Sequence, residues 1–157
     1  MRDELARIVT PGTPDTATAK PLLEKLVWKD SYSVGDQALD DQHKKLVELI
    51  NRLADCHAER SIGSSGAFHE VLAHMFDYTQ VHFKAEEGHL QRVGYPQLSE
   101  HKVEHDAFVE KTVTFSLAAS EGVQDEVAVH RYLKDWFLSH VLESDMQYRP
   151  HMPGQQS

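Results

Sequence analysis

Apolar side chains recur at helical spacing along most of the chain. Between residues 46 and 54 they occupy the i, i+3, i+4, i+7 positions of an amphipathic helix, at Leu46, Val47, Ile50, Leu53 and Ala54. This pattern predicts a helix that begins at Asp40 or Asp41, either of which is a suitable N-cap, and ends at Glu59. Ser and Gly residues at 61–66 predict a linker after it.

Three more helices are expected, over 67–93, 97–120 and 124–148. Gly94 is a suitable C-cap for the second helix, and Pro96 follows two residues later. No strand-like alternation competes with this pattern. Four helices of roughly 20 to 27 residues joined by short loops predict an all-α fold, an up-down-up-down antiparallel four-helix bundle.

The first 26 residues differ from the rest of the chain. Pro11, Gly12, Pro14 and Pro21 lie among small polar residues, which predicts an extended or mobile leader over 1–26. The bundle domain is then expected over 27–152, with an ordered loop at 28–39 that enters the first helix.

Composition narrows the function. The chain has 157 residues, of which 40% are hydrophobic, and a formal net charge of −9. This acidic balance argues against binding to nucleic acids or to anionic membranes, and no apolar run reaches the roughly 18 residues of a membrane span. Cys56 has no partner for a disulfide, and the N-terminus lacks the pattern of a signal peptide. We therefore expect a cytoplasmic protein and, from its charge, a monomer.

Eleven histidines are dispersed from residue 43 to residue 151. Histidine is the side chain most often used to bind transition metals. Each predicted helix carries metal-binding side chains: His43 on the first, His82 and Glu86 on the second, His101 and His105 on the third, and His140, followed by acidic residues, on the fourth.

The spacing and depth of these donors favour a shared site. Residues four apart face one side of a helix, one turn from each other, and on the third helix that side also carries Phe108, Thr112 and Phe115. One His–His pair at this spacing is on the order of the chance expectation for eleven histidines. The depth is more specific, because the donors lie early on the odd helices and late on the even ones. An antiparallel bundle brings all of them to one end.

Several segments that contain these donors resemble the bacterial hemerythrins. They are Asp-Gln-His-Lys at 41–44, His-Phe-Lys-Ala-Glu-Glu at 82–87, Gly-Tyr-Pro at 94–96, His-x-x-x-His at 101–105 and Trp-Phe-Leu-Ser-His-Val-Leu-Glu-Ser-Asp at 136–145. The entry loop at 28–35 is similar as well, and the resemblance runs in order over 28–151.

The resemblance implies a centre of two iron ions with an oxo or hydroxo bridge. One ion would be bound by His101, His105 and His140, the other by His43 and His82, and both would be bridged by Glu86 and Asp145. Counted this way, the two-histidine iron keeps one vacant position, and hemerythrins bind dioxygen there.

Asp145 conflicts with regular helix geometry. It lies five residues after His140, about 140° round an α-helix, so that spacing alone favours Glu143. The resemblance implies Asp145, and a π-type turn between 140 and 145 would place it on the face of His140.

Other residues are assigned by their position on the helices. An apolar lining of the centre is expected from Leu46, Phe83, Trp136 and Phe137, with plain core packing as the alternative. His89 lies on the donor face and is interpreted as a half-buried histidine or as an additional residue near the centre. Five histidines are expected on the surface: His57, His69, His74, His130 and His151.

We therefore expect a non-haem di-iron protein that binds dioxygen reversibly, for carriage, storage or delivery to an oxygen-using enzyme, and is not itself an enzyme. One alternative is a sensor of oxygen, nitric oxide or redox state, but the leader is too short for an output domain. Another is a di-iron enzyme of the peroxidase type, but the sequence offers no additional acid–base pair or substrate cleft.

Overall fold

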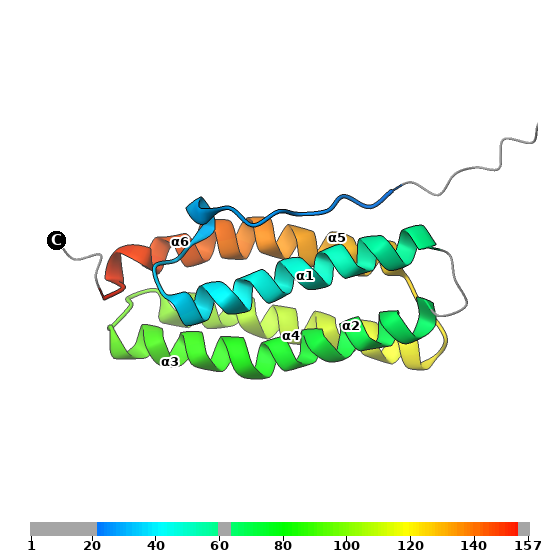
Figure 1. Cartoon of the computed structure of the whole chain (residues 1–157). Coiled ribbons are helices and arrows are strands. Elements are labelled where there is room, and N and C mark those ends of the chain that lie inside the picture. Colours follow the sequence, from blue (N-terminus) through cyan, green and yellow to red (C-terminus); the bar gives the residue numbers. More distant parts are fainter. Residues whose placement is uncertain (1–21, 60–63, 154–157) are drawn as a thin grey trace, which may run out of the picture.

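Four long helical segments form the protein, as a computed structural model shows for residues 22–59 and 64–153 (Figure 1). In chain order they are α1 (Gln37–Glu59); α2 (Ser64–Tyr78) continued by η2 (Thr79–Phe83) and α3 (Lys84–Arg92); α4 (Leu98–Ser120); and α5 (Glu126–Trp136) continued by η3 (Phe137–Ser144) and α6 (Asp145–Tyr148). Single 3-10 turns, η1 (Asp30–Tyr32) and η4 (Arg149–His151), flank the bundle. The described residues contain no strand, and the predicted all-α antiparallel bundle is confirmed.

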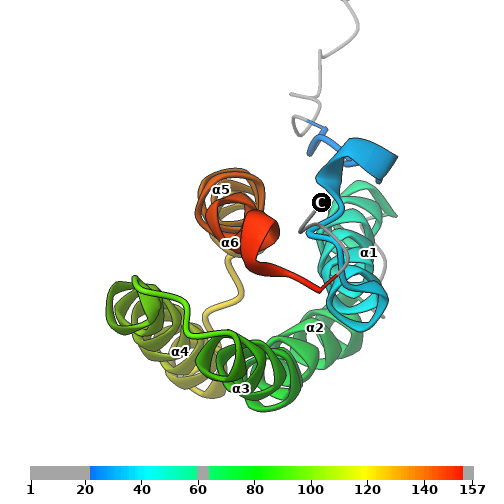
Figure 2. The same ribbon diagram turned by 90° about the vertical axis from the view of Figure 1, so that its left-hand side faces the viewer.

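The four segments surround a common core, which Figure 2 shows from one end of the bundle. α1 packs against α2 on one side and against α5 on the other, and α4 packs against α2 and α3. None of the helices in the described parts of the chain is long and apolar enough to cross a membrane.

The start of α1 differs from the prediction. The helix begins at Gln37, so neither Asp40 nor Asp41 is the N-cap. Asp36 has that role, because its Oδ1 accepts a hydrogen bond from the Leu39 N–H at 3.0 Å. The Asp40 carboxylate binds the entry loop instead, where it accepts hydrogen bonds from the Val34 N–H (2.9 Å) and the Ser33 hydroxyl (2.6 Å).

The Asp40 contact gives a stability prediction. Val34 is fully buried, so its N–H loses its acceptor without access to water when Asp40 is replaced by alanine. We expect Asp40→Ala to lower the free energy of unfolding by about 2 kcal/mol, measured by urea denaturation of the metal-free protein. Asp41→Ala is the matched control, because Asp41 is exposed and pairs with Lys44 at the surface. Equal unfolding midpoints for the two variants would contradict the prediction.

The second segment ends at Arg92, one residue earlier than predicted, with Val93 as its C-cap and Gly94 in the turn that follows. This residue has a φ of 67°, which an L side chain rarely adopts. The turn is closed by hydrogen bonds from the Tyr95 N–H to the Leu90 carbonyl (2.9 Å) and from the Gly94 N–H to the Gln91 carbonyl (3.2 Å).

The predicted linker at 61–66 is wrong in its second half, because α2 begins at Ser64. Small polar residues are tolerated in the first turn of a helix, whose N–H groups need no intrahelical partner. Residues 60–63 lie outside the described residues.

The apolar core consists of two clusters along the bundle axis. The larger cluster contains Leu46 and Ile50 from α1, Tyr78 and Phe83 from the second segment, Phe108 from α4, and Trp136 and Phe137 from the fourth. The smaller one, at the other end, contains Val34, Leu39, Leu90, Tyr95, Tyr148 and Met152. On α1, for example, Leu39 belongs to the smaller cluster and Leu46 to the larger, and His43 lies between them. The predicted metal-binding residues therefore occupy a layer between two apolar layers.

The residues before the first helix run along the outside of α1 and α5 (Figure 1). The Asn51 side chain forms hydrogen bonds with both the N–H (2.7 Å) and the carbonyl (2.8 Å) of Leu26, and His130 Nε2 donates to the Glu24 carbonyl at 2.8 Å. Residues 22–26 of the predicted leader are thus held against the bundle, and residues 1–21 lie outside the described part of the chain.

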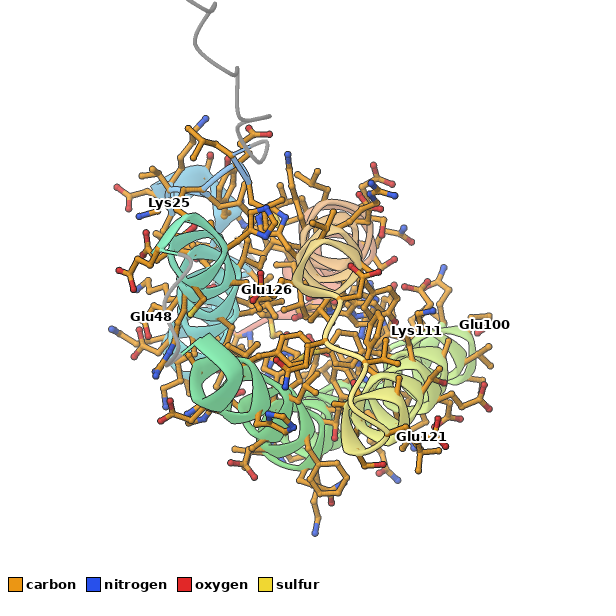
Figure 3. The ribbon with its side chains drawn as sticks, turned by 90° about the vertical axis from the view of Figure 1, so that its right-hand side faces the viewer. Lys25, Glu48, Glu100, Lys111, Glu121 and Glu126 are labelled. Atoms are coloured by element: carbon orange, nitrogen blue, oxygen red, sulfur yellow. The ribbon has the colours of Figure 1, made fainter. Side chains whose placement is uncertain are left out.

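Two of the histidines expected on the surface are buried. His57 is 2% and His130 is 4% exposed, so the surface assignment of these two was wrong. His57 continues the apolar face of α1 four residues after Leu53, and its Nδ1 lies 2.9 Å from Glu126 Oε2. Figure 3 shows Glu126 directed toward the interior of the bundle. His57 pairs with Glu126 and His130 with the Glu24 carbonyl, in the half of the bundle that is far from the predicted metal-binding residues.

Candidate metal centre

Seven buried side chains from all four segments meet in the layer between the apolar clusters. They form two groups, in each of which the ligand atoms lie within 4.8 Å of one another: Glu86, His101, His105 and His140 in the first, and His43, His82, Glu86 and Asp145 in the second. All seven are at most 4% exposed. The structure therefore brings together every residue that the sequence predicts for the site.

Asp145 reaches the centre because the fourth segment is π-helical over Phe137–Ser144. The wider turn rotates Asp145 onto the side of His140, so that Asp145 is fully buried while Glu143 is exposed. The π-type turn expected from the sequence is confirmed. The second segment has a π-helical turn as well, over Thr79–Phe83, and the sequence analysis missed it.

The two carboxylates lie between the two groups of histidines. Asp145 Oδ2 is 3.1 Å from His43 Nε2, and its Oδ1 is 3.0 Å from His140 Nε2 and 3.4 Å from His101 Nε2. Glu86 Oε2 is 3.0 Å from His101 Nε2, 2.9 Å from His105 Nε2 and 3.8 Å from His82 Nε2. Each carboxylate can therefore serve ions in both groups.

The imidazoles are oriented by acceptors on neighbouring helices. The Nδ1–H groups of three histidines donate hydrogen bonds outward: His82 to Gln42 Oε1 (2.7 Å), His105 to Glu87 Oε1 (2.8 Å) and His140 to Glu104 Oε2 (2.5 Å). These bonds orient the rings and, in the neutral form of each imidazole, leave the Nε2 lone pair free to face the centre. On the other side of the centre, the Tyr148 hydroxyl donates to Glu86 Oε1 at 2.5 Å.

Aromatic rings cover the imidazoles on the side of the larger apolar cluster. Phe83 stacks on His105 with a centroid distance of 3.8 Å, Trp136 on His140 at 4.0 Å, and Tyr78 on His82 at 4.5 Å. These rings exclude water from that side of the centre. Of the expected lining residues, Phe83 and Trp136 contact imidazoles directly, whereas Leu46 and Phe137 are buried members of the larger cluster.

Burial and charge act in opposite directions on the ionisable groups. Burial lowers the pKa of His82 to about 3. Burial also opposes protonation of His140, but the carboxylates of Asp145 and Glu104 outweigh it and raise its pKa to about 10. Without metal, the centre therefore keeps a proton on His140 at neutral pH. An ion that binds His140 Nε2 has to displace this proton, so binding weakens as the pH falls.

The donor set fits a pair of transition-metal cations. Asp145 is fully buried, and its oxygens lie against the imidazole nitrogens of His43, His101 and His140 at 3.0–3.4 Å, without a hydrogen bond of full geometry among the described residues. A buried carboxylate in this state is costly unless a cation compensates it. Five imidazoles with two carboxylates and no thiolate suit a mid-row transition metal such as iron better than magnesium or structural zinc.

His89 lies outside both groups of metal-binding residues. Its side chain is 15% exposed, and its Nδ1 is 4.0 Å from Asp36 Oδ2, at the start of α1. It is thus a half-buried histidine beyond the centre, as in the first of the two interpretations from the sequence.

Comparison with known proteins agrees with this geometry. Residues 34–152 match the model of the hemerythrin HHE cation-binding domain. A bacteriohemerythrin from Clostridium acetobutylicum is 30% identical over 125 residues, which cover 78% of this chain and 97% of that protein. A hemerythrin-like protein from Naegleria fowleri is 35% identical over 122 residues, covering 78% of this chain and 89% of the relative.

Solved structures show the same arrangement of helices. The crystal structure of a wild-type hemerythrin superposes with a TM-score of 0.68 at 27% identity, covering 80% of this chain and 95% of that one. The crystal structure of a mutant hemerythrin gives a TM-score of 0.71 at 28% identity with the same coverage. Together with the family match over three quarters of the sequence, these likenesses show that the chain belongs to the hemerythrin family.

Proposed function

We propose that the chain binds two iron ions through His43, His82, Glu86, His101, His105, His140 and Asp145, and that it binds dioxygen reversibly at this centre. Its role would be oxygen carriage, storage or delivery to an oxygen-using enzyme. Membership of the hemerythrin family supports the di-iron centre, and the geometry of the seven side chains supports their assignment as ligands.

One asymmetry of the centre carries the proposal. Three imidazoles converge on one group, where His105 Nε2 and His140 Nε2 lie 3.2 Å apart. Only two imidazoles, His43 and His82, converge on the other, with their Nε2 atoms also 3.2 Å apart. With both carboxylates shared, the two-histidine ion has one protein ligand fewer. That position is open to a small molecule.

Two ferrous ions supply the two electrons that reversible binding of dioxygen requires. The protein orients the ligands and keeps water out. Gln42, Glu87 and Glu104 hold three imidazoles in place, and the stacked rings of Tyr78, Phe83 and Trp136 are buried. Such shielding favours release of intact dioxygen over irreversible oxidation of the metal.

A surface groove offers a route to the two-histidine side. It has a volume of about 440 Å³, lies between α1 and the second helical segment, and reaches the centre through His82. It is lined by charged side chains at its mouth and by Tyr78 and His82 at its base. A molecule as small as dioxygen needs only brief side-chain motion to pass from this base into the core.

Visible absorption spectroscopy tests the proposed function. The iron-loaded, reduced protein is exposed to air and then flushed with argon over several cycles. We expect a charge-transfer band that appears with oxygen and disappears when oxygen is removed. A single irreversible oxidation on first exposure to air would contradict reversible binding and would favour a sensor or an enzyme.

The outer acceptors give a separate prediction. Glu104 accepts hydrogen bonds from His140 and from the Ser144 hydroxyl, so Glu104→Ala frees the His140 ring to rotate. We expect the affinity for ferrous iron to fall by about 10- to 100-fold, measured by competition with a chelator. Glu100→Ala, one turn earlier on the exposed face of α4 (Figure 3), is the control. Equal affinities of the two variants would show that Glu104 does not position His140.

A further inference from the structure

Two buried polar atoms at the edge of the centre have no partner. Tyr78 is 7% exposed and Trp136 is 8% exposed, and within the described residues neither the Tyr78 hydroxyl nor Trp136 Nε1 forms a hydrogen bond of full geometry. Such groups are rare in folded proteins, because burial removes their hydrogen bonds to water without replacing them. A donor of this kind beside a binding site is suited to contact the ligand.

Tyr78 lies on the side of the centre that has only two histidines. It is the last residue of α2, directly before the π-helical turn, and its ring stacks on that of His82 at 4.5 Å with an interplanar angle of 17°. The Tyr78 ring therefore lies beside the group with the open position.

Trp136 and Tyr78 have aromatic neighbours in common. Its ring stacks on His140, and both Trp136 and Tyr78 pack against Phe83, with centroid distances of 5.8 and 5.5 Å. Both also pack against Phe108, at 4.6 and 5.9 Å. The rings of Trp136 and Tyr78 thus share two phenyl neighbours, at the boundary between the larger apolar cluster and the centre.

The positions of the two groups decide which of them can reach a ligand. Both can donate a hydrogen bond, one from an indole N–H and the other from a phenol O–H. Trp136 stacks on His140, in the group with three histidines, whereas Tyr78 stacks on His82, in the group with the open position. Tyr78 is therefore the donor placed to contact a ligand there.

We propose that Tyr78 donates a hydrogen bond to a small ligand bound on the two-histidine side of the centre. The ligand belongs to the class of small molecules with negative charge at the free end, such as azide or dioxygen that has accepted electrons. This inference rests on the function proposed above and names the residue that retains the ligand.

Azide is the probe for this contact. The full chain is loaded with iron, oxidised and titrated with azide, with the change in visible absorption as the readout. We expect Tyr78→Phe to bind azide about tenfold more weakly than the unmodified protein, since a hydrogen bond to a charged acceptor is lost. The iron content should stay the same. Tyr132→Phe is the matched control, because the half-buried Tyr132 packs against Phe108 and Phe115 without touching the centre.

A second measurement uses the metal-free chain. Replacement of an unpartnered hydroxyl by hydrogen removes a desolvation cost, so Tyr78→Phe should leave the melting temperature unchanged or raise it. A lower melting temperature of the metal-free variant would mean that the hydroxyl has a structural partner, and it would overturn the inference.

The results for azide separate this inference from the proposed function. Equal azide affinities of Tyr78→Phe and the unmodified protein, at equal iron content, would overturn the role of Tyr78 alone. An unmodified protein that takes up no iron, or that binds no azide when loaded, would overturn the proposed function and the role of Tyr78 with it.

Discussion

Replacement of Asp145 by alanine is expected to remove both metal ions from the protein. Asp145 places one oxygen 3.1 Å from His43 Nε2 in one group and the other 3.0 Å from His140 Nε2 in the second. Its loss takes a negatively charged ligand from each ion at once. We expect the affinity for iron to fall by more than about 100-fold, beyond the range typical of residues that only orient a ligand. Metal analysis of the purified, iron-loaded variant measures the effect.

Glu143 provides the control for this experiment. It lies two residues before Asp145, near the end of the π-helical turn η3, and on a regular helix it would be the better placed of the two. In the structure Glu143 is exposed, so Glu143→Ala should retain the full iron content. Loss of metal in Glu143→Ala together with retention in Asp145→Ala would contradict the assignment of Asp145.

Metal loading is expected to raise the melting temperature by roughly 10–20 °C. Each ion stabilises the folded state by about 2.7 kcal/mol at a free concentration 100 times its dissociation constant. For a domain of this size each kcal/mol corresponds to roughly 2–4 °C. In the metal-free chain the fully buried Asp145 and Glu86 lie close together, and their repulsion opposes folding until cations are bound. Calorimetry of anaerobic, iron-loaded protein and of chelator-treated protein gives the shift.

The choice of ion makes the calorimetric experiment specific. Magnesium prefers oxygen ligands and retains its water, so five imidazoles should not bind it. An equal shift with magnesium, or no shift with ferrous iron, would mean that the seven side chains do not form a transition-metal site.

Helical periodicity and turn residues determine the bundle, and the sequence was sufficient to predict it. The beginning of α1 could not be predicted in the same way, because Asp36, Asp40 and Asp41 are all suitable caps by residue type. Which of them caps the helix depends on the entry loop. The Asp40 carboxylate accepts a hydrogen bond from the buried Val34 N–H there, and Asp36 is the cap. This contact is tertiary and leaves no trace in the local pattern.

The π-helical turns show why one part of the site was predictable and another was not. The five-residue interval between His140 and Asp145 is incompatible with a shared face on a regular helix. Because the family resemblance implied Asp145 rather than Glu143, this mismatch predicted the turn in η3. His82 and Glu86 are four residues apart and already share a face. Their spacing therefore gave no sign of the π-helical turn over Thr79–Phe83.

The residues that orient the imidazoles were missed, although they follow a simple rule. Gln42, Glu87 and Glu104 are each adjacent in sequence to a residue of the centre. Neighbouring residues on a helix point about 100° apart. A side chain next to a ligand on one helix therefore points toward the adjacent helix and reaches the back of a ligand there, as Glu104 reaches His140. The sequence alone does not predict accurately enough which helices are adjacent. The three acceptors could therefore not be paired with the imidazoles that they orient.

Anomalous X-ray scattering at the iron edge from crystals of the iron-loaded protein tests the central claim most directly. We predict two peaks, one among Glu86, His101, His105 and His140 and the other among His43, His82, Glu86 and Asp145. A single peak, or iron bound elsewhere while these imidazoles keep their metal-free contacts, would contradict the account.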